Sequence, residues 1–581
     1  MWSRNYLTYF LFILLSFFAT NAQAANKFWV ASGSGDKIWW DNNNWSNSDN
    51  GPPGADPPAN NDQAFFTGNG LLDVKITTNV KILKLILKKT YTGTVRIEGG
   101  LFTSRNGLNQ QGGNILVSGT GRLKVTNAAY NLGNPNYNTN ASLIFEDTST
   151  SFKVFHNFIM YPGTTFTAPS SGTDRFIVKG GFNNYGGIFN HNNGTLWMSP
   201  AWDANNSNTA WGAGLNIVGS GTGRNLYNFT KNGRKNVSLA SNIVIENNLR
   251  VIGTGRLRSN NKNITIGGNW YMQKSASFIR STSIVTFNGS SAQTINSAAQ
   301  FHKVTIANIA GEVSLVGSNA GRVANTLTIN NGATFDINGR NLTANTLVNN
   351  GNLQLLGSET VSITSMDTDS GTVTYDGSNA TGLAAGNSYF GLTFDQSGTS
   401  TLDANLDVNG DLTITNGTLD ASSSSHDINV GGDWTNNGSF ISRAGTVTFD
   451  NDSNVFSGGT GTSNDFNDVV LSGTAGSQSD DIKVNGDFTI SSTGTWSTNC
   501  NTLTVSGTKS AGSGTISGSL TPDVSEFIPA HASSAHASSD NIIIKFNTGL
   551  RQANDSDLTN SNIDAHITLK DTNSSGSNID F

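Results

Sequence analysis

The sequence predicts an all-β protein: a right-handed parallel β-solenoid (β-helix) with an N-terminal cap, followed by a truncated Ig-like β-sandwich. Three observations lead to this prediction. The 581 residues include 65 Gly and only 10 Pro, and 13% are charged, so the polarity comes mainly from Asn, Ser, Thr and Gly, as in turn-rich all-β proteins. Whole phrases of sequence recur along the chain. Short apolar alternations separated by Gly, Asn, Asp and Ser fill these phrases, and no stretch shows sustained helical periodicity.

Residues 1–24 have the features of a secretory signal peptide. Arg4 precedes an apolar run from Tyr6 to Ala19, and Ala22 and Ala24 supply the small residues of a cleavage site. The alternative, a membrane anchor, needs about 20 apolar residues, and this run is shorter. No later segment of the sequence is apolar for long enough to span a bilayer. The chain is therefore expected to be exported and secreted or held at the cell surface.

Residues 25–75 form an aromatic-rich module that is expected to cap the solenoid. The stretch "FWVASGSGDKIWWDNNNWSNSDNGPPGADPPANNDQAFF" from Phe28 to Phe66 resembles the opening module of large secreted bacterial surface proteins of the adhesin and autotransporter kind. Its order of Trp29, Trp39 or Trp40, "NNWS" and "PPG" carries the resemblance. The first coil of a solenoid has no neighbour to cover its apolar end, so buried rings are expected here. The alternative role for these tryptophans is a platform on which sugars stack.

Residues 76–520 are expected to form the solenoid repeats. The phrase "GGNWYMQKSASFIRSTSIVTFNG" from Gly267 recurs as "GGDWTNNGSFISRAGTVTFDN" from Gly431, and the polar residues differ freely between the copies. The aromatic positions are shared by the two copies, which predicts that these rings face the interior and carry no ligand. They are Trp270, Phe278 and Phe287 in one copy and Trp434, Phe440 and Phe449 in the other. Phe182, Phe189 and Trp197 occupy the aromatic positions of a divergent first copy.

A second phrase defines a long repeat. It reads "IVIENNLRVIGTGRL", "LDVNGDLTITNGTL" and "IKVNGDFTISSTGTW", and its copies recur at a nearly constant long spacing, marked by Leu249, Leu327, Leu412 and Phe488. Within a copy, apolar landmarks recur at a shorter interval, which is the same from Leu327 to Leu342 as from Phe488 to Leu503. Short strands at such spacings favour stacked solenoid coils, and a string of small β-sandwiches is the alternative. "VNGDLTI" and "VGGDWTNNGSF" are similar to the β-solenoid repeats of the same surface proteins.

Residues 521–581 resemble a bacterial Ig-like domain of the S-layer and adhesin type. Expected strands are Ile542 to Phe546 and Ile567 to Asp571. About 60 residues are present where such a module needs about 100. The sequence therefore predicts a partial domain, with the missing strands and further domains or an anchor beyond Phe581.

Acidic pairs are the candidates for catalysis by a polysaccharide lyase or hydrolase. Each lies beside Gly, Ser or Asn in a predicted turn, at different positions of the repeat, and we interpret them as turn residues. Glycoside hydrolysis needs two carboxyl groups about 5 to 10 Å apart, and nothing in the spacing favours such a pair, so no catalytic residue is predicted. The pairs are Asp367 and Asp369, Asp450 and Asp452, Asp465 and Asp468, and Asp480 and Asp481.

Histidine and cysteine give no metal-ligand spacing. Weak calcium binding by Asp and Asn oxygens in turns is the only cofactor expectation. Cys500, the only cysteine, is expected inside a coil as a small apolar side chain. With a net charge of −6 and no long basic run that includes aromatic residues, nucleic-acid binding is not expected. The histidines are His156, His191, His302, His426, His531, His536 and His566.

Together these features predict an exported bacterial surface protein of the adhesin-like kind. It would be a non-enzymatic β-solenoid stalk that binds extracellular glycans or surface proteins through its long polar faces. The alternative is a polysaccharide-active β-helix protein, either a lyase or hydrolase or a glycan-binding module.

Overall fold

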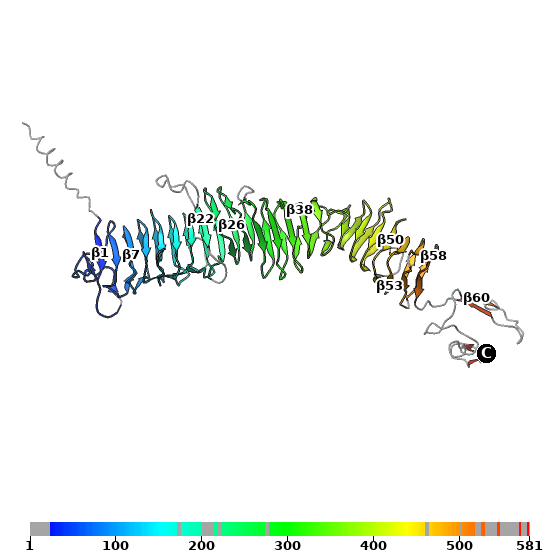
Figure 1. The fold of residues 1–581 in the computed structure, drawn as a ribbon, viewed down its shortest axis with the longest axis horizontal. Coiled ribbons are helices and arrows are strands. Elements are labelled where there is room, and N and C mark those ends of the chain that lie inside the picture. The colour runs from blue at the N-terminus through cyan, green and yellow to red at the C-terminus, as the bar shows by residue number, and fades with distance from the viewer. Residues whose placement is uncertain are drawn as a thin grey trace, which may run out of the picture. The chain divides into compact units, whose positions relative to one another are not determined.

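A computed structural model describes residues 24–35, 37–170, 176–199, 213–217, 223–273, 278–458, 464–491, 493–499 and 501–517, together with four short strands between 524 and 579. The described chain is almost entirely β, with one 3-10 turn, η1 (Asn42–Asn44). Its strands stack in parallel as the coils of a β-solenoid (Figure 1). The chain divides into two compact units, Met1–Leu353 with Thr360–Met366 and Gln354–Glu359 with Asp367–Phe581. The all-β parallel solenoid predicted from the sequence is confirmed.

From β4 (Gln63–Phe66) to β21 (Thr195–Met198), each coil contributes one strand to each of three sheets. A representative coil contains β10 (Leu108–Gln110), β11 (Asn114–Val117) and β12 (Arg122–Val125). These pair in parallel with β13 (Tyr130–Leu132), β14 (Ser142–Phe145) and β15 (Ser151–Val154) of the next coil. Side chains alternate between buried and outward positions along each strand, because successive side chains of a strand point to opposite faces.

Register between coils places like side chains on top of one another in the interior. Phe152 stacks on Phe176 with ring centroids 5.6 Å apart, and Phe158 stacks on Phe182 at the same distance. A third ladder joins Phe166 to Phe189 at 5.5 Å. The three ladders lie in the three sheets and meet in one core, which makes these coils a continuous aromatic column.

The repeated aromatic phrase builds the same cluster in each unit. In the first unit the Trp270 ring packs edge-on against Phe278 at 5.3 Å and against Phe301 at 5.1 Å. In the second, Trp434 packs against Phe440 at 4.9 Å and Phe466 at 5.3 Å. All six rings predicted to face the interior are at most 5% exposed, so that prediction is confirmed; they are Trp270, Phe278, Phe287, Trp434, Phe440 and Phe449.

The short interval between apolar landmarks is not the length of a coil, which corrects the sequence interpretation. Leu327 is in register with Leu347 of the next coil rather than with Leu342, and Leu412 is in register with Trp434. Leu503 lies on β57 (Leu503–Val505) and pairs with Ile482, in a different sheet from Phe488. Leu327 and Leu342 lie in one sheet but out of register, and Phe488 and Leu503 lie in two sheets, so the shorter interval does not join equivalent positions of two coils.

Asparagine and aspartate side chains close the corners between sheets. The Oδ1 atom of Asn248 accepts a hydrogen bond from the backbone N–H of Asn269 at 2.8 Å, and Asp411 does the same for Asp433 at 2.9 Å. Each side chain thereby supplies the acceptor that a backbone N–H at a corner requires. We call these residues the corner ladder. Other members are Asn79, Asn228, Asn236, Asn242, Asn261, Asn263, Asn269, Asn341, Asp427, Asp433, Asp452, Asp468, Asp481 and Asp487.

The first strands confirm a buried aromatic cluster near the N-terminus. Strand β1 (Asn26–Trp29) pairs in antiparallel fashion with β3 (Trp45–Ser46) and in parallel with β4 (Gln63–Phe66). Trp29, Trp39 and Trp45 are fully buried and pack on one another, so their rings cannot serve as sugar platforms. Trp40 is 48% exposed, and its Nε1 donates to Thr78 Oγ1 at 2.9 Å.

Only fragments of the region 521–581 belong to the described chain. Strand β60 (Val524–Ile528) pairs in antiparallel fashion with β61 (Ile543–Phe546), and β62 (Leu569–Lys570) pairs with β63 (Asn578–Ile579). The Ig-like sandwich stays a prediction. The signal peptide before residue 24 and Cys500 lie outside the described residues.

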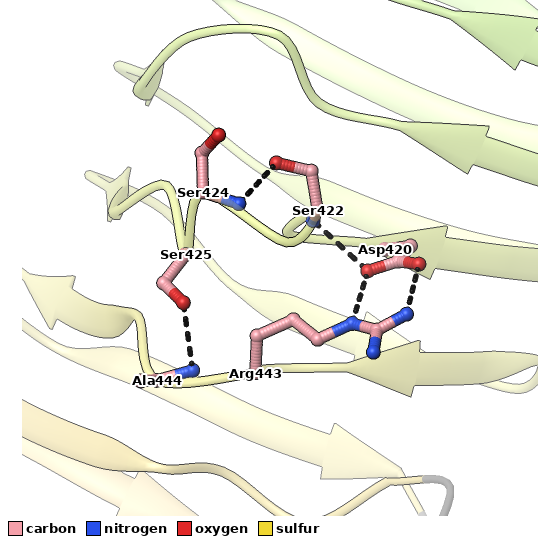
Figure 2. A network of polar contacts seen from close by, with 6 residues as sticks. All are labelled: Asp420, Ser422, Ser424, Ser425, Arg443 and Ala444. Atoms are coloured by element: carbon pink, nitrogen blue, oxygen red, sulfur yellow. Dashed lines mark hydrogen bonds and ion pairs between the residues drawn. The ribbon is translucent and has the colours of Figure 1, made fainter.

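A charged corner in the second unit joins two successive coils (Figure 2). Asp420 ends β46 (Leu412–Asp420), and its carboxylate accepts two hydrogen bonds from Arg443, Nε to Oδ1 at 2.9 Å and Nη2 to Oδ2 at 2.8 Å. The backbone N–H of Ser422 donates to the same Oδ1 at 2.9 Å. Arg443 holds this geometry with a left-handed backbone, φ 55°. These hydrogen bonds from Arg443 lower the pKa of Asp420.

The substitution Arg443→Met is expected to lower the melting temperature of the second unit at pH 7. A lowered carboxyl pKa contributes stability above the pKa of the unfolded group, about 3.9, and the contribution is lost as the pH falls through the folded value. The difference between the two proteins should therefore disappear in strong acid. Calorimetric scans from pH 7 to pH 2 measure this. Arg443→Lys keeps the charge and loses the planar pair of donors, so its melting temperature should lie between those of the parent and the Arg443→Met protein. A difference in melting temperature that stays constant with pH would contradict a stabilising ion pair between Asp420 and Arg443.

Candidate binding surface

The acidic pairs singled out from the sequence lie at corners and are engaged in the fold. Asp452, Asp468 and Asp481 belong to the corner ladder, with hydrogen bonds of 3.0, 2.7 and 2.7 Å from backbone N–H groups of the next coil. Asp480 accepts from the backbone of Gly458 at 2.9 Å. Asp465 forms an ion pair with Lys483 Nζ at 2.6 Å, and Asp369 accepts from Ser370 at 3.3 Å. Asp367 follows β40 (Val361–Met366).

One asparagine joins two carboxylates from different coils. Asn429 Nδ2 lies 2.7 Å from Asp450 Oδ2 and 3.5 Å from Asp407 Oδ1. Burial, and then the nearby Asp407 charge, raise the pKa of Asp450. The amide group of Asn429 fills the space between the two acids, where a glycosidase would hold the scissile bond. The two acids therefore add negative charge to this part of the surface, but they are not presented to a substrate as a carboxylate pair.

The histidines are dispersed. His191 Nε2 lies 3.0 Å from Glu246 Oε2, its Nδ1 accepts from the backbone of Asn193 at 3.0 Å, and its ring stacks on Tyr227. In the described ranges, no three His, Cys, Asp or Glu side chains come together as ligands of one metal ion. His531, His536 and His566 lie outside the described residues.

An ordered array of cationic and aromatic side chains lies on the outer side of one sheet in the first unit. Its strands are β6 (Val80–Ile82), β9 (Leu101–Ser104), β12, β15, β18 (Phe176–Val178), β21 (Thr195–Met198), β23 (Asn228–Lys231), β26 (Leu249–Val251) and β29 (Trp270–Met272). One residue inside each strand stands in register with those of its neighbours on this side of the sheet, and of these Thr230 is buried. In order these residues are Lys81, Thr103, Lys124, Lys153, Ile177, Trp197, Thr230, Arg250 and Tyr271.

We call this array the basic–aromatic face. With about 4.8 Å between parallel strands, its nine positions span about 38 Å. Lys81, Arg250 and Tyr271 are exposed, and Lys153 and Trp197 are half-buried. The spacing gives a linear track on which one side chain from each coil meets an elongated ligand.

The position of Trp197 corrects the sequence interpretation. The divergent copy was expected to place Phe182, Phe189 and Trp197 at equivalent interior positions. Phe182 and Phe189 are buried, but Leu196 and Met198 occupy the interior of β21, so Trp197 points outward between them. A shift of one residue along a strand moves a side chain to the opposite face.

Cationic side chains on or beside the basic–aromatic face contact aromatic rings. Phe155, which follows β15, lies between two ammonium groups, with Lys179 Nζ 4.0 Å and Lys124 Nζ 4.9 Å from its ring centroid. The Arg250 guanidinium lies 5.5 Å from the Tyr271 ring centroid. Among the described residues, Lys81, Lys124, Lys153 and Arg250 form no ion pair with a carboxylate. Their charge is therefore available to an anionic ligand.

Sequence reasoning missed this face because each member is separated from the next by a full coil of chain. The signal was present as a charge imbalance: between residues 25 and 353 there are 27 Lys and Arg against 14 Asp and Glu. The net charge of the whole chain, −6, conceals it.

Comparisons with protein family models, curated proteins and solved structures return no match for this chain. No helix in the described part of the chain combines the length and apolarity of a membrane span.

Proposed function

We propose that this chain is an exported, adhesin-like solenoid of the bacterial cell surface that binds anionic extracellular glycans through its basic–aromatic face. The observation that carries the proposal is the register of nine positions over successive coils, six of which hold a cationic or aromatic side chain. The proposal retains the right-handed turn of the coils and a partial Ig-like domain over residues 521–581.

The chemistry of the face fits an acidic polysaccharide. Uronic acids repeat a carboxylate along an extended chain, and ammonium and guanidinium groups bind carboxylates by charge-assisted hydrogen bonds. The apolar face of a sugar ring packs against an aromatic ring, for which Trp197 and Tyr271 offer area with little loss of side-chain entropy. Because the coils are held by backbone pairing, these groups are arranged before the ligand arrives, which lowers the entropic cost of binding.

The acidic residues support binding rather than turnover. The corner-ladder carboxylates each accept a backbone hydrogen bond between coils, and Asp450 is held by Asn429. In these structural roles the carboxylates are already engaged by hydrogen bonds, whereas a hydrolase would need them free for its substrate. The polysaccharide lyase or hydrolase therefore becomes an outcome of the test below.

Binding to immobilised polygalacturonate, with neutral dextran as the control polymer, tests the proposal. The protein is expected to bind the acidic polymer and not the neutral one, and to release no unsaturated uronic acid. Trp197→Ala and Tyr271→Ala should each weaken binding about tenfold, which corresponds to about 1.4 kcal/mol. Tyr185→Ala, which removes an exposed ring after β19 (Phe182–Asn184) in a different sheet, is the matched control and should bind normally. Equal binding to dextran would contradict the proposal, and accumulation of unsaturated product would favour the lyase.

A further inference from the structure

The two units of the chain carry opposite charge. Residues 25–353 contain 27 Lys and Arg against 14 Asp and Glu, whereas residues 354–520 contain 3 against 18. Charge of one sign in each half of a protein predicts interaction with a surface of the opposite sign. A second copy of this chain carries both charges and is always present at the same concentration, so it is the partner that we consider.

The corner ladder shows that the fold does not require positive and negative charge to be separated between the two units. In the first unit the acceptors are Asn, as at Asn228, Asn248 and Asn269, and in the second they are mostly Asp. An Asn side chain supplies the same Oδ1 acceptor without a charge. Asp73 of the first unit also accepts a backbone hydrogen bond from the next coil, from Thr94 at 2.7 Å, and its charge is paired with Arg96, whose Nη2 lies 3.1 Å from Oδ2.

The ladder aspartates of the second unit gather around one sheet. This sheet includes β45 (Leu406–Val408), β47 (Ile428–Val430), β50 (Thr446–Phe449), β52 (Asp468–Leu471) and β55 (Phe488–Ile490). We call the sheet and its flanking carboxylates the acidic face. The carboxylates are Asp407, Asp411, Asp427, Asp433, Asp450, Asp452, Asp468 and Asp487.

The carboxylates of the acidic face are oriented for an external partner. Asp411, Asp427 and Asp433 each accept a backbone hydrogen bond through Oδ1, at 2.9, 2.9 and 2.8 Å. Asp468 and Asp487 do the same at 2.7 and 2.6 Å. These bonds fix the direction of each carboxylate. Four of the side chains are exposed and Asp468 is half-buried. Such a fixed carboxylate suits a guanidinium donor.

A set of exposed arginines in the first unit provides the matching charge. Residues 224–280 contain ten Lys and Arg and one acidic residue, Glu246, which is engaged by His191 and Asn225. Arg258 lies on β27 (Leu257–Arg258) and Arg256 directly precedes it, whereas Arg234 precedes β24 (Val237–Leu239) in the coil before. All three arginines are exposed, and within the described ranges none forms an ion pair. We call Arg234, Arg256 and Arg258 the arginine belt.

We propose that copies of this chain associate with each other, the acidic face of one copy against the arginine belt of the next. The two surfaces are different, so the contact is heterologous and each bound copy still presents one free surface of each kind. Such contacts extend into open chains unless the rotation closes a ring. Self-association would align several basic–aromatic faces, but it uses other residues and does not depend on glycan binding.

Sedimentation velocity at about 20 mM and about 500 mM salt tests the proposal, because screening shortens the reach of surface charges from about 20 Å to about 4 Å over this range. The protein is expected to form species that grow with concentration at low salt and to be monomeric at high salt. An acidic-face variant replaces Asp411, Asp427, Asp433, Asp468 and Asp487 by Asn, which keeps the corner-ladder acceptors. A belt variant carries Arg234→Gln, Arg256→Gln and Arg258→Gln.

Each variant alone should be monomeric at low salt, with an unchanged or higher melting temperature. A mixture of the two should give only 1:1 dimers, because one acidic face and one arginine belt remain between them. A monomeric parent protein at low salt, or an acidic-face variant that still associates, would overturn the proposal. Failure of the mixture to dimerise would also overturn it. Lys124→Gln, which changes the basic–aromatic face, is the control and should leave association unchanged, so a failure here is separate from a failure of glycan binding.

Discussion

The substitution Trp434→Ala is expected to destabilise the surrounding coils by about 3 to 5 kcal/mol, the cost of removing a buried aromatic side chain and leaving a cavity. The Trp434 ring is fully buried and packs against Phe440 and Phe466. In a solenoid each coil contacts mainly its neighbours, so the loss should be local. Hydrogen exchange measured by mass spectrometry should show faster exchange in β46, β48 (Trp434–Asn436) and β51 (Asn454–Gly458) than in the first unit.

Trp434→Phe is the matched control for this prediction. The indole Nε1 atoms of Trp434 and Trp270 are buried, and neither has a hydrogen-bond partner among the described residues. Phenylalanine keeps most of the apolar area and removes an unsatisfied donor, whose burial is unfavourable. The loss of stability should therefore be much smaller than in the Trp434→Ala protein. Exchange in the Trp434→Ala protein that matches the parent would show that the ring is not part of the core.

The substitution Lys231→Met is expected to stabilise the first unit by about 1 to 3 kcal/mol at pH 7, because it removes a buried charge that has no acidic partner in the described part of the chain. Lys231 is fully buried, at an inward position in register with Met198 and Val251. Its Nζ donates to the carbonyl oxygen of Gly233 at 2.9 Å. Burial lowers the pKa of Lys231 to about 8. Methionine has a similar length and no charge, and the register partners of Lys231 in the neighbouring coils are already apolar.

The pH dependence separates this effect from simple repacking. An unfolded lysine keeps its proton up to about pH 10.4, whereas folded Lys231 loses it near pH 8. Between these values the unfolded state binds more protons, so the stability of the parent protein should rise with pH and approach that of the Lys231→Met protein. Denaturation at pH 7 and pH 10 measures the gap. Lys153→Met, at an outward position, should give no comparable gain, and a gap that does not narrow at pH 10 would contradict the assignment.

The solenoid and its interior could be predicted from sequence because apolar spacing and turn residues are local signals. Trp270 and Trp434 recur with their neighbouring phenylalanines, and repetition of rings without repetition of ionisable groups already indicated packing. The coil length was not visible, since Leu412 and its register partner Trp434 are separated by the remaining strands and corners of a whole coil.

The candidate surface could not be predicted, for the same physical reason. Lys124, Lys153 and Trp197 become neighbours only when coils stack, and the outward position of Trp197 depends on a shift of one residue in β21. The Asp residues of the phrases "VNGDL" and "VGGDW" looked like ordinary turn residues. Their second role, as charged substitutes for Asn in the corner ladder, appears only when Asp411 and Asp433 are seen to accept hydrogen bonds from the next coil.

The salt dependence of the affinity for polygalacturonate is the measurement that tests the central claim most directly. Calorimetric titrations at low and at physiological ionic strength compare the parent protein with a variant that carries Lys81→Gln, Lys124→Gln and Lys153→Gln. If the basic–aromatic face binds the polymer, the parent affinity falls steeply as salt rises, because bound cations release the counterions of the polyanion. The variant should bind more weakly at low salt and lose less affinity as salt rises. Equal affinities and equal salt dependence in the two proteins would contradict the assignment of this face.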